Sequence, residues 1–261
     1  MEWNTEYNST QYRVGLTFKG SNDTFTIKGR VLGSKSRYVV QGSTGDFIEV
    51  SFSSILRNIT HNPYKPTVYG WGILGSGSTD DPAYNTWKAM VRRCYCEQPD
   101  FMVRNKSYST CSVDEVWRYF TNFKIWWESN YIKGFVLDKD IKSLGVAVKV
   151  YSPDTCMYVP VEINRIVVER NSSSGDSKLP TGVSRRGDIF RGVIVKGDKK
   201  IAISSRNKFE VLYRYYRSKQ MQMEEYLDMY TNLIPEDNTI SMRDYYMQKM
   251  RTCGYEVIGE V

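Results

Sequence analysis

Hydrophobic and polar positions alternate with period two over the first seventy residues. Short runs of β-branched and aromatic residues are separated by Gly, Ser, Asn and Asp; they read GLTFKG, DTFTIKGRVLG, RYVVQG and DFIEVSF. Such alternation is typical of half-buried strands joined by turns. The pattern predicts a small antiparallel β domain over residues 1–75, ending in an ordered linker rich in proline and glycine.

At Pro82 the period changes to that of a helix. The stretch AYNTWKAMVRRCY places Tyr84, Trp87 and Met90 on one face. Further along, Ser112 with Glu115 three residues later forms the capping-box pattern of a helix start. That helix is expected to bury an aromatic stripe: Val116, Tyr119, Phe120, Phe123 and Trp127.

Residues 134–170 read as strand, loop, strand and helix. FVLDKDI predicts a strand, and VKVYSP and CMYVPVEINRIVVER continue after it. Pro153 and Asp154 favour a turn, and Pro160 suits the first turn of a short helix carrying Glu162 and Asn164. We expect residues 76–170 to form one core with the aromatic helices.

The last third predicts a second sheet and two helices. NSSSGDSK (171–178) reads as a linker, followed by three short strands with turns at Arg186-Gly187 and Gly197-Asp198. A helix over 207–220 has an apolar face of Phe209, Leu212, Tyr213 and Tyr216, and a second helix ends before Gly254. The whole pattern predicts an α+β, modular chain.

Charge is concentrated in one segment. Residues 178–220 carry 12 Lys/Arg and 3 Asp/Glu, whereas residues 221–261 carry 3 and 8. A local excess of positive charge is typical of a surface that binds a polyanion. The helix over 240–253, which lies within the acidic segment 221–261, offers apolar and Tyr side chains either to its own core or to a protein partner; these are Ile240, Met242, Tyr245, Tyr246 and Met250.

Several function classes receive no support from the composition. The polar first residues predict no signal peptide, and no run approaches the roughly 20 apolar residues of a membrane span. The five cysteines lack a CxxC pair and the single histidine is His61, so the sequence predicts neither a disulfide framework nor a zinc site.

The stretch VLDKDI is the candidate for chemistry. An acidic residue on a strand and an amide on the following helix can together hold a divalent ion against a phosphate. Asp138 and Asn164 would be those metal ligands, with Asp140 as a further ligand and Glu162 as an alternative ligand on the helix. Spacing alone also fits a strand end with solvated charges. Lys139 lies between two carboxylates, which keep it charged and favour contact with a phosphate over proton transfer.

A combination of motifs resembles a known family. W-x-x-M-x-x-R-C-Y, L-D-K-D-I, Y-S-P-D-T-C with V-P-x-x-I-N, and L-P-x-G-V occur here in order. They resemble the HNH-endonuclease-like proteins of bacteriophages, relatives of homing endonucleases with an AP2-type DNA-binding module. The resemblance covers most of residues 12–220 and implies an HNH-like ββα-metal core over 76–170, an AP2-like module over 178–220 and an added acidic helical extension over 221–261.

The resemblance implies catalytic roles for Asp138, Lys139 and Asn164, with Asp138, Asn164 and Asp140 holding Mg²⁺ or another divalent ion. Lys139 stands where most HNH enzymes have histidine, and the loop SLGVAVKV lacks the family's Gly-Asn-Lys. Two functions therefore stay open: DNA binding on a degenerate HNH-like scaffold, and metal-dependent hydrolysis of DNA. A third is a repurposed scaffold that inhibits or redirects a host or phage protein.

The basic module carries the predicted DNA contacts. Its sheet is expected to enter the major groove of double-stranded DNA, where arginine pairs with guanine and lysine contacts phosphate. The expected contact residues are Arg185, Arg186, Arg191, Lys196, Lys199 and Lys200. The resemblance places the protein in the cytoplasm of an infected bacterium, with no membrane partner.

Overall fold

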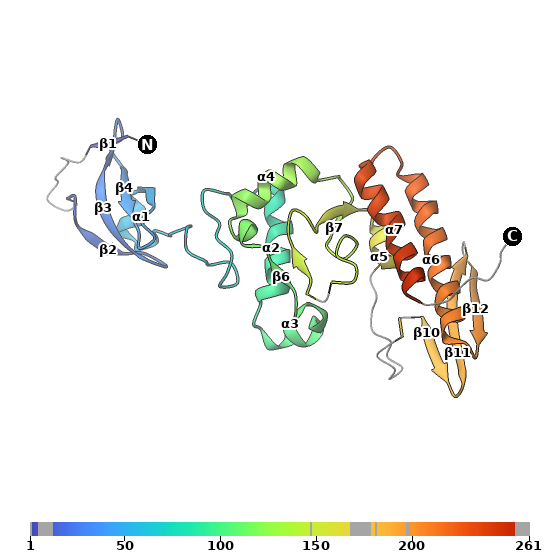
Figure 1. The fold of residues 1–261 in the computed structure, drawn as a ribbon. Helices are drawn as coiled ribbons and strands as arrows, with labels where there is room; N and C mark the ends of the chain where they lie inside the picture. Colours follow the sequence, from blue (N-terminus) through green and yellow to red (C-terminus); the bar gives the residue numbers. More distant parts are fainter. Residues whose placement is uncertain are drawn as a thin grey trace. The chain divides into compact units, whose positions relative to one another are not determined.

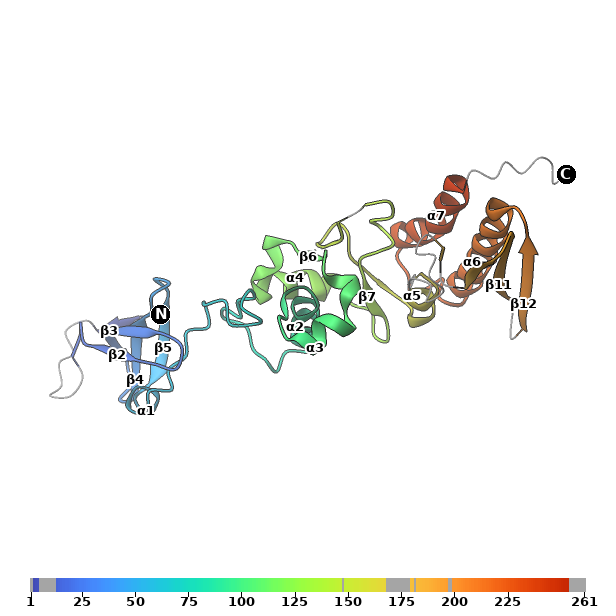
Figure 2. The same ribbon diagram turned by 90° about the horizontal axis from the view of Figure 1, so that it is seen from below.

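The computed structural model describes residues 2–4, 13–146, 148–167, 179–180, 182–196 and 199–253. In this part the chain is mixed α and β, as the sequence predicted. It divides into two compact units, one of Met1–Lys106 with Glu115–Ile125 and the other of Ser107–Asp114 with Trp126–Val261. Figures 1 and 2 show the elements of both units from two directions.

The N-terminal strands form a curled antiparallel sheet in the order β1-β3-β4-β5, with β2 paired to β3. The strands are β1 (Trp3–Asn4), β2 (Thr17–Lys19), β3 (Thr24–Val31), β4 (Arg37–Gln41) and β5 (Phe47–Ser51). Phe25, Ile27 and Val40 face the core from alternate positions, and Ile55 joins them from helix α1 (Phe52–Leu56). The predicted antiparallel strands are confirmed.

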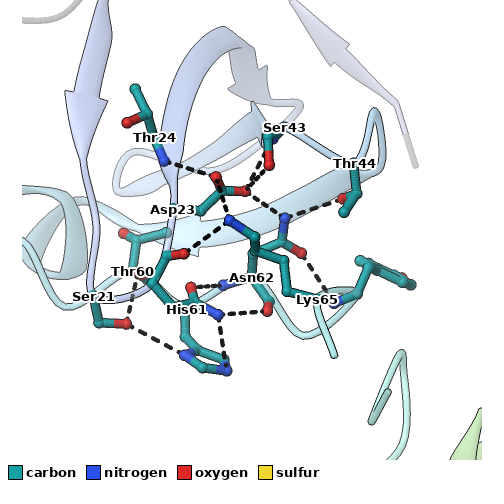
Figure 3. A network of polar contacts seen from close by, with 11 residues as sticks. Ser21, Asp23, Thr24, Ser43, Thr44, Thr60, His61, Asn62 and Lys65 are labelled. Carbon is teal, nitrogen blue, oxygen red and sulfur yellow. Dashed lines mark hydrogen bonds and ion pairs between the residues drawn. The ribbon is translucent and has the colours of Figure 1, made fainter. Parts of the chain in front are cut away.

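A polar network around the buried side chain of Asp23 fastens the chain after this sheet to its loops (Figure 3). The Asp23 carboxylate accepts hydrogen bonds from the amides of Thr24 and Ser43 and, at 2.6 Å, from the side chain of Asn62. Lys65 adds an ion pair at 3.2 Å. Asn62 is fully buried, so the start of the predicted linker is an integral part of the β domain.

The first helical pattern is confirmed. Helix α2 (Pro82–Tyr95) begins at Asp81, whose side chain accepts a hydrogen bond from the Ala83 amide, and Pro82 occupies its first turn. Trp87 is fully buried and its indole N–H donates to the carbonyl of Trp117 at 2.7 Å. A short helix, α3 (Pro99–Arg104), follows.

The predicted helix start at Ser112 is wrong. Ser112–Val113 form strand β6, which pairs in parallel with β8 (Val150–Tyr151). A 3-10 turn, η2 (Glu115–Arg118), follows, and helix α4 spans Phe120–Asn130. Val116 and Tyr119 are 51% and 42% exposed, so only part of the expected stripe is buried. Pairing with a distant strand outweighs the local capping pattern here.

The second unit contains the predicted strand, loop, strand and helix. Strand β7 (Val136–Asp138) pairs antiparallel with β9 (Met157–Val159), and helix α5 (Val161–Val167) follows Pro160. Another 3-10 turn, η1 (Lys106–Tyr108), precedes β6. The predicted linker 171–178 lies outside the described residues.

Three antiparallel strands and two helices complete the second unit. The strands are β10 (Val183–Arg186), β11 (Ile189–Lys196) and β12 (Lys199–Ser205), in that order in the sheet. Helix α6 (Lys208–Met229) continues beyond the predicted end at 220 and packs against α7 (Glu236–Thr252). The predicted turn at Gly197-Asp198 lies outside the described residues.

The buried faces of both helices differ from the predicted ones at their first positions. Phe209 and Ile240 are each 51% exposed, whereas Val211 and Tyr215 are buried although the pattern did not include them. Met242 of α7 is buried, as predicted. Asn207 caps α6 by accepting hydrogen bonds from two amides of its first turn. Contacts with β11 and α7 therefore decide which side of α6 is buried. The local periodicity of the sequence carries no information about these contacts.

The acidic extension docks on its own unit. Tyr245 donates a hydrogen bond to the carbonyl of Val167 and Tyr246 to that of Ile166, both in the last turn of α5. The carbonyls of a last helical turn lack partners within the helix. The two tyrosines thus donate hydrogen bonds to carbonyls at the end of α5. They also join α7 to the part of the core that contains β7 and β9.

Candidate functional site

The three-stranded sheet has one face covered by α6. Val183, Gly192 and Ile203 lie directly opposite one another across β10, β11 and β12, and Val183 and Ile203 are buried. A Cβ atom at Gly192 would come within 3.1 Å of side-chain carbons of Ile203 and of Val211 on α6. Glycine at this position therefore allows the helix to approach the sheet closely.

The opposite face of the sheet, which we call the open face, is exposed and basic. Because side chains alternate along a strand, residues one position away from the covered row point outward. The open face comprises Ser184, Arg186, Ile189, Arg191, Val193, Lys200, Ala202 and Ser204. All except the half-buried Ser184 are exposed.

The open face combines cations with small and apolar side chains. Arg191 lies between Ser184 and Ser204, and Val193 lies opposite Ala202. Within the described residues, Arg186, Arg191 and Lys200 form no ion pair. Their charges are therefore not neutralised by side chains that the structure describes, and they remain accessible to an external anion.

Arg185 lies on the other side of the sheet. Its Nε donates to the carbonyl of Gly187 at 2.9 Å, and its guanidinium lies 5.4 Å from the centroid of the Phe190 ring. These contacts hold the turn between β10 and β11. Of the other predicted contact residues, Lys199 is exposed at the start of β12, and the Lys196 side chain lies outside what the structure describes.

The end of β7 carries the second candidate site. Asp138 is 3% exposed, and its Oδ1 accepts hydrogen bonds from the amides of Asp140 at 3.0 Å and Ile141 at 2.9 Å. Burial raises the pKa of Asp138 to about 6; the charge of Asp140 adds to the rise, and the two amides oppose it. The carboxylate thus shapes the turn that follows the strand.

Lys139 is buried among groups that keep it charged. Its ammonium contacts both oxygens of Asp140, at 2.8 and 3.0 Å. Burial lowers the pKa of Lys139, but the hydrogen bond and charge of Asp140 outweigh that effect, so the pKa is raised above its usual value. A lysine held in this state does not accept a proton from water.

The loop after Lys139 is closed by two further polar contacts. The Ser143 hydroxyl donates to the Lys139 carbonyl, and the Lys149 ammonium donates to the Ser143 carbonyl. Burial lowers the pKa of Lys149. Sequence patterns did not single out Ser143 or Lys149, because their partners are backbone atoms of a loop.

Asn164 is half-buried on α5, a helix that contacts β7. In the described part of the chain, the side chains of Asp138 and Asn164 share no hydrogen bond. Glu162, the alternative ligand, accepts a hydrogen bond from the Tyr230 hydroxyl at 3.2 Å. This hydrogen bond joins α5 to the residue that directly follows α6.

The carboxylates at the end of β7 do not fit a divalent metal ion. One oxygen of Asp138 already accepts hydrogen bonds from two amides, and both oxygens of Asp140 contact the ammonium group of Lys139. A hard dication needs several free oxygen ligands and is repelled by a neighbouring ammonium. Among the described residues, no three His, Cys, Asp or Glu side chains form a metal-binding group.

Across the described residues, no helix has both the length and the apolar character needed to cross a membrane. Comparisons with protein-family models, with curated proteins and with solved structures find no match for this chain.

Proposed function

We propose that this chain is a DNA-binding protein that contacts double-stranded DNA through the open face. The observation that carries the proposal is the set of exposed cations on that face, Arg186, Arg191 and Lys200, which form no ion pair with the described residues. They belong to residues 178–220, the segment with 12 Lys/Arg and 3 Asp/Glu. Such an excess attracts the phosphate backbone over long distances.

The chemistry of the open face suits the major groove. A two- or three-stranded ribbon can enter that groove, arginine can pair with a guanine edge, and apolar side chains can contact a thymine methyl group. The arrangement of a three-stranded sheet with a helix on its other face agrees with the AP2-like module that the resemblance implies. The order of two paired strands, β7 and β9, followed by helix α5 likewise agrees with the ββα arrangement that the resemblance implies.

Hydrolysis of DNA is not part of the proposal. Lys139 is engaged by Asp140, and the oxygens around it do not fit a divalent ion. We therefore propose a phage-type scaffold whose catalytic site is degenerate, acting on DNA in an infected bacterial cell. The alternative of a protein partner for the acidic extension is weakened because Met242, Tyr245 and Tyr246 are buried in the unit's own core.

Fluorescence anisotropy with a labelled duplex of mixed sequence tests the proposal. Binding should be measurable at about 50 mM KCl and weaken steeply with added salt, and Lys200→Gln should reduce the log–log salt slope by about 1. In parallel, supercoiled plasmid should stay intact with Mg²⁺, Mn²⁺ or EDTA. Absence of binding at low salt contradicts the DNA proposal, and metal-dependent nicking lost in Asp138→Ala contradicts the degenerate site.

A further inference from the structure

The ammonium group of Lys139 is a deeply buried positive charge in the second unit. Its side chain is only 7% exposed. Lysine is almost never buried to this extent without a partner, because removal of the ammonium from water is unfavourable. Its position after a strand that also carries the buried Asp138 therefore requires a compensating environment.

Three separate segments supply that environment. The Asp140 carboxylate contacts the ammonium through both oxygens, and the rings of Tyr108 and Tyr151 each have their centroid 5.4 Å from it. Aromatic rings attract a cation that lies over their faces, most strongly when water is excluded. We call these three residues, Tyr108, Asp140 and Tyr151, the lysine cage.

The lysine cage joins parts of the chain that are distant in sequence. Tyr108 lies just before β6, Tyr151 belongs to β8, and β6 pairs with β8. Other described ionisable groups also interact electrostatically with Lys139 or its neighbours: Asp138, Lys149, Lys249, Cys111 and Cys156. The ammonium thus lies where β6, β8 and the loop after β7 meet.

We propose that the Lys139 ammonium is a built-in cation of this core, held in the lysine cage in the role that a bound ion has in a metal-dependent scaffold. The cation is covalently part of the chain, so the folded core needs no added ion and repels divalent ones. The lysine cage itself is a binding site for a monovalent alkylammonium group. A shortened side chain at position 139 leaves that site open to a free alkylammonium ion.

Chemical rescue of Lys139→Ala in the whole chain tests this proposal. Alanine lacks the atoms of a propylammonium ion, and the probe is propylammonium chloride. The thermal midpoint of the variant should fall by roughly 5–10 °C, because a buried partner of Asp140 is lost. Propylammonium at tens of millimolar should raise it again by a few degrees, as ligand binding to the folded state does.

Two controls separate charge from shape. 1-Propanol has a similar shape and no charge, and it should not restore the midpoint of Lys139→Ala; the wild type should respond to neither probe. Equal rescue by propanol and propylammonium overturns the proposal, because the site would then recognise only methylene groups. Absence of rescue by propylammonium in a folded variant also overturns it.

A second pair of measurements covers the case in which Lys139→Ala does not fold. Lys139→Met keeps the apolar stem and removes the charge, so its midpoint should fall below that of the wild type; equal stability contradicts a role for the cation. Wild-type protein should have the same midpoint in Mn²⁺ and in EDTA. A rise with Mn²⁺ that disappears in Asp138→Asn overturns the built-in cation.

Discussion

The Asp23 network gives the sharpest stability prediction. In Asp23→Asn, one carboxylate oxygen becomes an NH₂ group that faces donors whichever way the amide is turned. One oxygen of Asp23 accepts from the amide of Thr24 and from Lys65, and the other accepts from Asn62 and from both the amide and the hydroxyl of Ser43. At least two donors therefore lose their acceptor.

Hydrogen bonds to a charged acceptor contribute about 1.5–3 kcal/mol each, and the Asp23 side chain is only 4% exposed, so we expect the variant to lose roughly 2–4 kcal/mol in the N-terminal domain. Hydrogen–deuterium exchange of the whole chain measures this locally. Peptides from the described strands β3 to β5 should exchange at least about thirtyfold faster if the domain opens as a unit. Asp46→Asn, a change of the same kind at a carboxylate with no hydrogen bond among the described residues, should leave the rates within about twofold.

The difference in stability between the wild type and Asp23→Asn should become smaller as the pH falls. Burial raises the pKa of Asp23, but hydrogen bonds from Asn62, Ser43 and Thr24 outweigh it and hold the pKa well below its usual value. A depressed folded-state pKa contributes stability that is complete above the unfolded pKa of about 4 and is lost as the pH falls below it. A loss under about 1 kcal/mol at pH 7, or one equal to that of Asp46→Asn, would refute the assigned role of the network.

Two further predictions concern the second unit. Because the pKa of Asp138 is raised to about 6, the folded state binds more protons than the unfolded state between about pH 4 and 6, and stability should fall as the pH rises through that range. Asp138→Asn keeps an oxygen for the two amides and should remove this slope in urea titrations without lowering stability at pH 7; a loss at pH 7 contradicts the account. Asn207→Ala removes the cap of α6 and should lower stability by about 1 kcal/mol in the same titrations, whereas an unchanged midpoint would show that the cap contributes nothing.

Local patterns were sufficient where each element is defined by its own residues. The alternating runs from 15 to 52 form the predicted strands, and Asp81 with Pro82 marks the start of α2. The three strands after residue 182 were also predictable, since Gly187 adopts a left-handed φ of 60° at the turn where a glycine was noted. These signals do not depend on distant parts of the chain.

Tertiary contacts decided the features that were missed. Ser112 and Glu115 carry a capping-box pattern, yet Ser112 pairs with Val150 in a strand. The lysine cage needs Tyr108 and Tyr151, which lie 31 residues before and 12 residues after Lys139, so no spacing rule identifies it. Likewise, consecutive arginines at 185 and 186 must point to opposite faces of a strand, but only the position of α6 determines which face is covered.

One comparison tests the central claim most directly: the affinity of Arg191→Ala and of Arg185→Ala for the same DNA duplex. Each substitution removes one positive charge from the same sheet, but Arg191 lies on the open face and Arg185 on the face covered by α6. The account predicts a loss of about 1–3 kcal/mol in binding free energy for Arg191→Ala and little change for a folded Arg185→Ala. Equal effects of the two substitutions, or no DNA binding by the wild type, would contradict it.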